Sequence, residues 1–536
     1  MRFIFSRMAT VAARRRALPR VPALDSARLR VLLGLLGLLA LSFWLRTAAL
    51  GEPYWIDEGL SLGISSHALV DIPGVLRQDG SPPLYYMLLH VWVDLFGSGE
   101  VATQSLSLVF SLATIPVGLW AGWSLFGERA GWLCAAACAL NPFLTTFTHD
   151  ARMYTLVMLL SIVIAACFAH AFVYRRRGHL IPFAIAIALL LYTHNWGLFV
   201  GAGAVVALVV CWRAADDRRG LIRDALLAFG GVALAFAPWL PTLAYQATHT
   251  GAPWSQAPPI DQLWLSFTVV LAGQGPTAVL ALGAGVGVAA LVGRAGDRER
   301  TAVLALIALG VATLVLAWGA SQLSPAWAGR YLAALFGPLV LVAALGLARA
   351  GRIGLAAGAL VVLLWGFSPG VPDFTAPSLE KTVVDELEPQ LERGDLVIST
   401  HPERLPVLDH YLPEGMRYAT TLGTVDDPGV MDWRDALARL RGAGVQETLG
   451  PLLDRVPRGG RVLLVRPIVE GDARSWQAPW TRLVRRRSSK WFRALNRDPR
   501  FERVDVTPLR AAESGRGVRG ILYIKRGGRS NPAPGG

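Results

Sequence analysis

The sequence predicts a polytopic α-helical membrane protein of about 11 transmembrane helices plus juxtamembrane helices, followed by a C-terminal extracytoplasmic α/β domain. Of the 536 residues, 53% are hydrophobic and 17% are charged, whereas soluble proteins average about 25% charged residues. Many windows hold about 17 to 25 mainly apolar residues, the length of helix that spans a bilayer. After residue 372 the chain becomes polar, and short strand-like runs begin.

Residues 1–30 are expected to form a basic cytoplasmic tail. The apolar run that follows is long and lacks a small-residue cleavage site, so it predicts an uncleaved first transmembrane helix rather than a signal peptide. The membrane domain is expected over 31–372, with apolar segments at 31–50, 101–126, 130–148, 153–174, 180–194, 196–212, 222–243, 277–293, 301–320, 329–348 and 353–371.

Arginine-rich turns separate several of these segments, and the positive-inside rule places such turns in the cytoplasm. They contain Arg175 to Arg177, Arg218 with Arg219, the 294–300 loop, and Arg349 with Arg352. Counting crossings from these turns puts every remaining connection on the outer side. The outer connections are a first loop over 51–100, the turns at 149–152 and 193–195, the loop 244–262, the turn 321–330, and the chain after 371.

One apolar stretch, 81–97, is short for a crossing. We interpret it as a juxtamembrane helix, and Pro82-Pro83 suits its start because the first helical N–H groups need no partner. A twelfth crossing is the alternative, and it would invert the later turns. The chain after eleven crossings lies outside.

The polar region 373–526 is predicted to be a soluble α/β domain. Strand-like runs at 395–400, 461–467 and 521–526 alternate with amphipathic helical patterns such as 433–444. Residues 527–536 are expected to be a disordered tail.

The net charge of +14 suits cytoplasmic loops of a membrane protein better than nucleic-acid binding, so no nucleic-acid partner is expected. All four cysteines lie in apolar segments without metal-ligand spacing, so we expect no disulfide framework and no metal site. The sequence contains no P-loop, GxGxxG, HExxH or GxSxG motif in a fitting context. A nucleotide-driven machine is therefore not favoured, and no cofactor is expected.

An acidic pair, Asp57-Glu58, directly follows the first apolar segment, and Asp79 lies in the same loop. Carboxylates at a bilayer edge are costly unless they serve a function. An interfacial turn, with Tyr54 and Trp55 in the aromatic belt, is the alternative interpretation.

A second polar interruption, THDARMY, contains His149, Asp150, Arg152 and Tyr154. The Arg152 guanidinium is a good phosphate ligand because its donors form a fixed fork. A local Asp150–Arg152 pair that caps a helix is the alternative. The crossing count places this turn on the same side of the membrane as Asp57.

Two further outer turns contribute His194, and Arg330 with Tyr331. A lone histidine in a membrane turn is more often structural than catalytic. Arg330 begins a helix at the outer face, where an anionic head group could bind. An anchor at the membrane interface is an equally weighted interpretation of Arg330.

These motifs together resemble the GT-C membrane glycosyltransferases. The resemblance lies in the acidic pair after the first helix, D-x-SPPLYY-x-LLH-x-W over 79–92, and the acid-Ala-Arg-Met-Tyr turn at 150–154. The branch that is most similar is the family 39-like group, which includes protein O-mannosyltransferases and lipid A aminoarabinose transferases. The resemblance covers about residues 30–370, and it is strongest over residues 54–160. Where that family often has Gln-Glu-Ala-Arg, this chain has His149-Asp150-Ala151-Arg152.

The resemblance implies sugar transfer from a polyprenyl-phosphate donor at the outer face of the cell membrane, with inversion and without a nucleotide or metal. It implies Asp57 as general base, Glu58 as its assistant, and Arg152 with Arg330 against the leaving phosphate. His149, Asp150, Tyr154, Asp79, His194 and Tyr331 are the remaining candidates for donor binding. The acceptor could be a protein, a glycolipid or a cell-wall polysaccharide.

Two classes of protein without transferase activity are alternatives. A lipid or glycan transporter or flippase predicts inverted repeats and ionisable groups at the bilayer midplane, and the sequence shows neither. A membrane scaffold whose C-terminal domain binds cell-wall polymer would tolerate Asp57→Asn.

Overall fold

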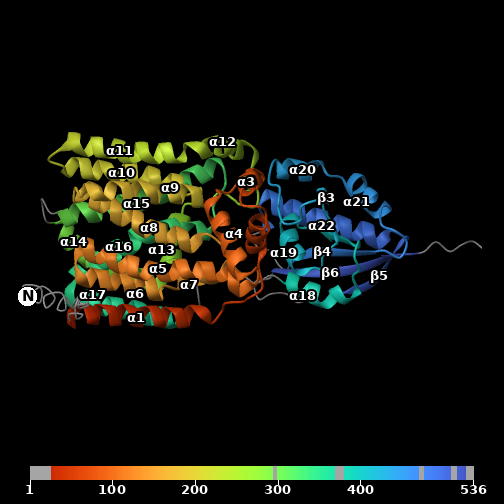
Figure 1. Ribbon diagram of the computed structural model, residues 1–536, viewed down its shortest axis with the longest axis horizontal. Helices are drawn as coiled ribbons and strands as arrows, with labels where there is room; N and C mark the ends of the chain where they lie inside the picture. Colours follow the sequence, from red (N-terminus) through yellow and green to blue (C-terminus); the bar gives the residue numbers. More distant parts are fainter. Residues whose placement is uncertain (1–25, 294–297, 368–378, 470–475, 509–515, 527–536) are drawn as a thin grey trace, which may run out of the picture.

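The computed structural model describes residues 26–293, 298–367, 379–469, 476–508 and 516–526. A helical bundle and a smaller sheet domain lie along one long axis, and α3 (Ile72–Asp79) and α4 (Leu84–Phe96) lie at their junction (Figure 1). The fold class predicted from the sequence is thereby confirmed. Most of the predicted N-terminal tail, residues 1–25, and the predicted tail 527–536 lie outside the described residues.

The other helices of the bundle follow one another along the chain, and most are joined by short turns. They are α1 (Ser26–Thr47), α2 (Ile56–Ser65), α5 (Glu100–Phe126), α6 (Glu128–Leu140), α7 (Pro142–Thr146), α8 (Tyr154–Phe168), α9 (Leu180–Thr193), α10 (Gly197–Ala214), α11 (Arg218–Phe236), α12 (Leu240–His249), α13 (Gln262–Val270), α14 (Gln274–Val292), α15 (Arg298–Leu323), α16 (Phe336–Arg349) and α17 (Gly351–Phe367). Short turns of other helix types, η1 (Phe147–His149), η2 (Ala169–Val173) and η5 (Gly329–Leu335), join some of them.

Among the described residues, eight helices are long and apolar enough to cross a membrane, or nine if the bent pair α6–α7 forms one span. These nine, together with the shorter apolar helices α9 and α17, correspond to the eleven predicted segments. The third short apolar helix, α4, has 13 residues, about 20 Å of helix against a hydrocarbon core of about 30 Å. It is also shorter than the other two short apolar helices, which run over Arg177–Thr193 and Gly351–Phe367, so its length agrees with a juxtamembrane helix.

The bend between α6 and α7 shapes the turn that carries Arg152. Pro142 cannot continue the preceding hydrogen-bond ladder, and the Asn141 side chain caps the new helix by accepting a bond from Leu144 N at 3.1 Å. The chain then turns through η1 and enters α8 at Tyr154.

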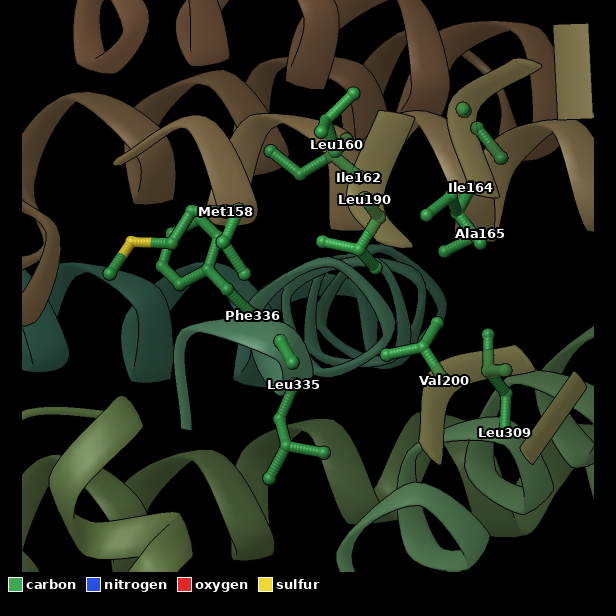
Figure 2. Packing of buried hydrophobic residues seen from close by; sticks show 14 of the residues in the cluster. Met158, Leu160, Ile162, Ile164, Ala165, Leu190, Val200, Leu309, Leu335 and Phe336 are labelled. Carbon is green, nitrogen blue, oxygen red and sulfur yellow. The ribbon is translucent and has the colours of Figure 1, made fainter. Parts of the chain in front are cut away.

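α8 is the most buried span of the bundle. Figure 2 shows its side chains Met158 and Leu160 in the hydrophobic cluster that also contains Leu335 and Phe336. Gly337 brings α16 against the α8 backbone, because a Cβ there would lie 2.2 Å from Ser161 O. A turn at the start of α8 is therefore attached to a rigid helix.

The sheet domain contains six strands in the order β3-β2-β1-β4-β6-β5. β1 runs parallel to β2 and β4, whereas the β2–β3, β4–β6 and β5–β6 pairs are antiparallel. The strands are β1 (Leu396–Ser399), β2 (Arg417–Thr420), β3 (Gly423–Val425), β4 (Arg461–Val469), β5 (Phe501–Val506) and β6 (Arg516–Lys525). The three predicted strands correspond to β1, β4 and β6; the other three were not predicted.

Helices cover both faces of this sheet. Successive strand residues point to opposite sides, so neighbouring residues of β1 pack against different helices. Ile398 packs in the cluster with α21 and α22, and Val397 packs in the cluster with α18 and α19. The helices of this domain are α18 (Glu380–Leu387), α19 (Leu405–Tyr411), α20 (Ala436–Gly442), α21 (Val445–Asp454) and α22 (Pro479–Arg497).

The sheet domain packs directly onto α2, the helix that carries Asp57. A Cβ on Gly59 would lie 2.3 Å from the Val407 side chain, and a Cβ on Gly63 would lie 2.0 Å from Gly429 O. These two glycines are four residues apart, so they lie on one face of the helix. That face admits backbone from the sheet domain at van der Waals distance, and α2 is held between the two domains.

The Gly63→Ala variant is expected to lose about 1–3 kcal/mol of stability, because the added methyl group meets backbone rather than a mobile side chain. Thermal unfolding and limited proteolysis of the purified protein measure the loss of docking. Gly74→Ala is the matched control, since a Cβ on Gly74 meets no atom within 4 Å. Equal unfolding temperatures for both variants would contradict the close contact.

Candidate functional site

The acidic pair occupies the first turn of α2. Glu58 fixes this turn, because its Oε2 accepts a hydrogen bond from Trp55 N at 3.1 Å. Carboxylates at a helix N-terminus are favoured by the backbone dipoles. Asp57 and Glu58 are consecutive in the helix and therefore project in different directions.

Asp57 forms an ion pair with Arg330. The Asp57 Oδ2 to Arg330 Nη2 distance is 3.0 Å, and both side chains are 15% exposed. Arg330 is enclosed by aromatic rings: its guanidinium carbon lies 5.4 Å from the Trp55 ring centre and 5.3 Å from that of Trp254. Rings at these distances stabilise a cation, so Arg330 is held in place while its buried Nε makes no hydrogen bond within the described residues.

Arg152 contacts the main chain of Asp57 and the next turn of α2. Its Nη1 donates to Asp57 O at 3.1 Å and to Ser61 Oγ at 2.9 Å, with Tyr86 OH at 3.3 Å. Its Nε is also buried without a hydrogen-bond partner in the described part of the chain. Two arginines with unused donors therefore contact Asp57, Arg330 at its carboxylate and Arg152 at its main-chain carbonyl.

Asp79 belongs to the same group of charges. Burial raises the pKa of its carboxyl, and the positive charge of Arg152 acts against that rise. The structure thus brings a second acid within electrostatic range of Asp57 and Arg152.

Three aromatic or imidazole rings complete this group. The His194 and Tyr331 ring centres are 4.7 Å apart, and Tyr154 lies 6.2 Å from His194. Burial, together with the charges of Arg152 and Arg330, lowers the pKa of His194 to about 3. His194 is therefore neutral, and since its Nδ1 accepts a bond from Trp196 N at 3.1 Å, its proton is assigned to Nε2. We call Asp57, Asp79, Arg152, Tyr154, His194, Arg330 and Tyr331 the charged cluster.

The structure places Glu58 and His149 away from the charged cluster, whereas Asp150 lies at its edge, within electrostatic range of Arg152, Asp57 and Arg330. Glu58 Oε1 accepts from Ala151 N at 2.9 Å and from Gln104 at 3.2 Å, so it ties α2 to the turn that carries Arg152. His149 Nε2 lies 2.6 Å from Arg46 O. Glu58 and His149 line a separate cavity of about 580 Å³ between α1, α7 and α17.

Asp150 and Glu58 form a buried acidic pair behind the charged cluster. Burial raises the pKa of Asp150, and burial with the Asp150 charge raises that of Glu58. Glu58 accepts three N–H bonds, which favour its ionised form. Asp150 accepts one, from Trp55 Nε1 at 3.0 Å, and its Oδ2 is buried without a hydrogen bond within the described residues. Because the pKa of each carboxyl group is raised, the pair as a whole retains a proton at a pH where an exposed carboxyl group has lost it.

The proton held by this pair makes stability fall with rising pH. A carboxyl group with a raised folded-state pKa contributes fully below its unfolded pKa of about 3.9, and the contribution is lost as the pH rises toward the folded pKa. Asp150→Asn is expected to flatten that slope, and to reduce the total loss of stability over this pH range by about 1.4 kcal/mol for each unit by which the pKa is raised. Unfolding measured from pH 4 to pH 9 tests this, and an unchanged slope would contradict it.

Several residues of the site were not predicted from the sequence. Ser61 and Tyr86 bind Arg152, and Trp254 stacks on Arg330. Tyr86 lies in the SPPLYY motif and Trp254 lies in a loop that was placed outside, so both carried a partial signal. No group of three or more His, Cys, Asp or Glu side chains suited to a metal ion occurs among the residues that the structure describes.

Comparison with solved structures identifies the architecture. ArnT from Cupriavidus metallidurans in the apo state matches with a TM-score of 0.59 and 14% identity, over 92% of this chain and 98% of that chain. The chain has the GT-C fold. The structure of ArnT bound to undecaprenyl phosphate matches with a TM-score of 0.60, 14% identity and the same coverage.

A second GT-C protein, the arabinofuranosyltransferase AftD from Mycobacteria, matches with a TM-score of 0.54 and 16% identity, over 94% of this chain and 42% of that chain. No protein-family model matches the sequence, and no match was found among curated proteins. The GT-C resemblance predicted from the motifs is thus confirmed at the level of fold.

Proposed function

We propose that the chain is a glycosyltransferase that moves a sugar from a polyprenyl-phosphate donor to an acceptor hydroxyl at the outer face of the membrane. The observation that carries this proposal is the charged cluster itself: the Asp57 carboxylate pairs with Arg330, Arg152 binds the Asp57 main chain, and both arginines have unused donors. In a displacement at an anomeric carbon, a carboxylate can take the proton of the attacking hydroxyl, and two cations can stabilise the negative charge of the leaving phosphate. The similarity to ArnT, which has been solved with undecaprenyl phosphate, supports the lipid donor.

In the proposed reaction, Asp57 takes the proton of the acceptor hydroxyl while its oxygen attacks the anomeric carbon. The bond from that carbon to the phosphate oxygen breaks, and its electron pair stays on the phosphate. Configuration inverts because attack and departure lie on opposite sides of the carbon. Arg152 and Arg330 stabilise the negative charge of the leaving polyprenyl phosphate, as fixed cations do in a water-poor site.

In the proposed scheme, Asp57 and Arg330 form an ion pair with each other before the donor binds. An arginine offers five N–H donors, so Arg330 can bind a donor phosphate through groups that Asp57 does not use. Asp57 then turns toward the acceptor. In this scheme Asp79 and the neutral His194 bind sugar hydroxyl groups, and Glu58 holds the turn that carries Arg152.

The direct test uses purified protein with a polyprenyl-phosphate sugar and an extract of acceptors. Release of polyprenyl phosphate that depends on the acceptor supports the transferase. Movement of intact donor across proteoliposomes without that release would instead support a flippase. Topology reporters at Asp79 and Thr400 test the outer location, and a cytoplasmic result at either would contradict it.

A further inference from the structure

A cavity of about 930 Å³ lies at the opposite end of the bundle from the charged cluster. It is bounded by the ends of η2 and α10 and by the start of α15. The other ends of these elements reach the charged cluster: α8 begins at Tyr154, α10 follows Trp196, and α15 leads to Arg330. The span Tyr154–Val173 has 20 residues, about 30 Å of helix, so the cavity lies at the other face of the membrane.

The cavity has an apolar wall and a basic rim. The wall is formed by membrane-embedded helix ends, namely Phe172, Val173, Val210, Cys211 and Leu304. The rim carries four arginines and two aspartates, which leaves two net positive charges: Arg175, Arg213, Arg298, Arg300, Asp216 and Asp217. This arrangement fits an amphiphile with an anionic head.

Two of the arginines keep donors that the described residues do not use. Arg175 pairs with Asp224 through Nη2 at 2.9 Å, but its buried Nη1 makes no hydrogen bond there. The buried Nε of Arg300 is in the same state. Buried polar groups are normally hydrogen-bonded, so these atoms point to a ligand that accepts hydrogen bonds.

We propose that this cavity binds the headgroup of an anionic phospholipid from the leaflet opposite the charged cluster. The phosphate accepts hydrogen bonds from the arginine forks, and the acyl chains follow the apolar wall into the bilayer. Basic pockets between membrane helices on the cytoplasmic side suit such headgroups. Because the cavity is a bilayer thickness from Asp57, this lipid takes no part in sugar transfer, and the inference is independent of the proposed function.

The test compares the protein in nanodiscs of phosphatidylcholine alone and of phosphatidylcholine with phosphatidylglycerol. Phosphatidylglycerol is expected to raise the unfolding temperature and to remain bound in native mass spectrometry. The combined Arg213→Gln and Arg300→Gln variant is expected to retain it about thirty-fold more weakly. Arg352→Gln, an exposed arginine outside the cavity, is expected to behave as the wild type.

Three results would overturn the proposal. They are equal retention of both lipids by the wild type, equal loss in the Arg352→Gln control, and full competition by inorganic phosphate, which would show a free-anion site. If the double variant does not fold, titration of phosphatidylglycerol against phosphatidylcholine in the wild type decides the question alone. None of these measurements requires turnover, so failure here is distinguishable from failure of the proposed transferase.

Discussion

The Asp57→Asn variant is expected to lose about 10²- to 10⁴-fold in transferase activity, the usual contribution of a general base, while it folds as the wild type does. An asparagine has nearly the same shape and keeps an oxygen next to Arg330, but it cannot take the hydroxyl proton. Release of polyprenyl phosphate measures the activity, and thermal unfolding measures the fold.

Asp71→Asn is the matched control, because Asp71 lies in the same loop, is exposed, and makes no side-chain cap. It should retain full activity. Normal turnover by Asp57→Asn would remove Asp57 as the base. If Asp79→Asn alone abolished turnover, the role would pass to Asp79, the other acid of the charged cluster.

The Arg330→Gln variant is expected to lose about 10²- to 10³-fold in the rate of transfer, as enzymes do when a preorganised partner of developing charge is removed. It should also bind polyprenyl phosphate about tenfold to a hundredfold more weakly, because a hydrogen bond to a charged group is lost. Arg330→Lys should recover part of the rate, since it keeps the charge without the fork.

Binding of polyprenyl phosphate separates the roles of the two members of the ion pair. Asp57→Asn removes a negative charge beside the phosphate and should tighten that binding, whereas Arg330→Gln should weaken it. Arg77→Gln provides the control, because Arg77 stacks on Tyr245 at 4.0 Å in an exposed position. Changes of the same sign in both cluster variants would contradict the proposed exchange of Arg330 between Asp57 and phosphate.

The sequence allowed much of the bundle and part of the charged cluster to be predicted, because both depend on local signals. Apolar length and arginine-rich turns are sufficient to place Asp57, Arg152 and Arg330 on one side. The contact of Arg330 with Trp254 joins residues that no local pattern connects, and it was not predicted. The packing of Gly63 against Gly429 also depends on tertiary structure alone.

Glu58 illustrates a different limit. Its position beside Asp57 suggested a shared role, but consecutive residues of a helix do not face one another. Two of its three hydrogen-bond partners, Gln104 and Ala151, lie 46 and 93 residues away. The position of Glu58 next to Asp57 therefore shows that the two residues share a local segment, but it does not show the direction in which the Glu58 side chain points.

The packing of α2 against the sheet domain also has a consequence for biosynthesis. The hydrogen bond from Tyr54 N to Tyr411 OH joins residues 357 positions apart. At a translation rate of about 5 to 20 residues per second, that interval lasts about 20 to 70 s. During this time the helix that carries Asp57 exists without its outer cover. A nascent chain that stops before the sheet domain is complete therefore lacks the contacts that hold α2 between the two domains.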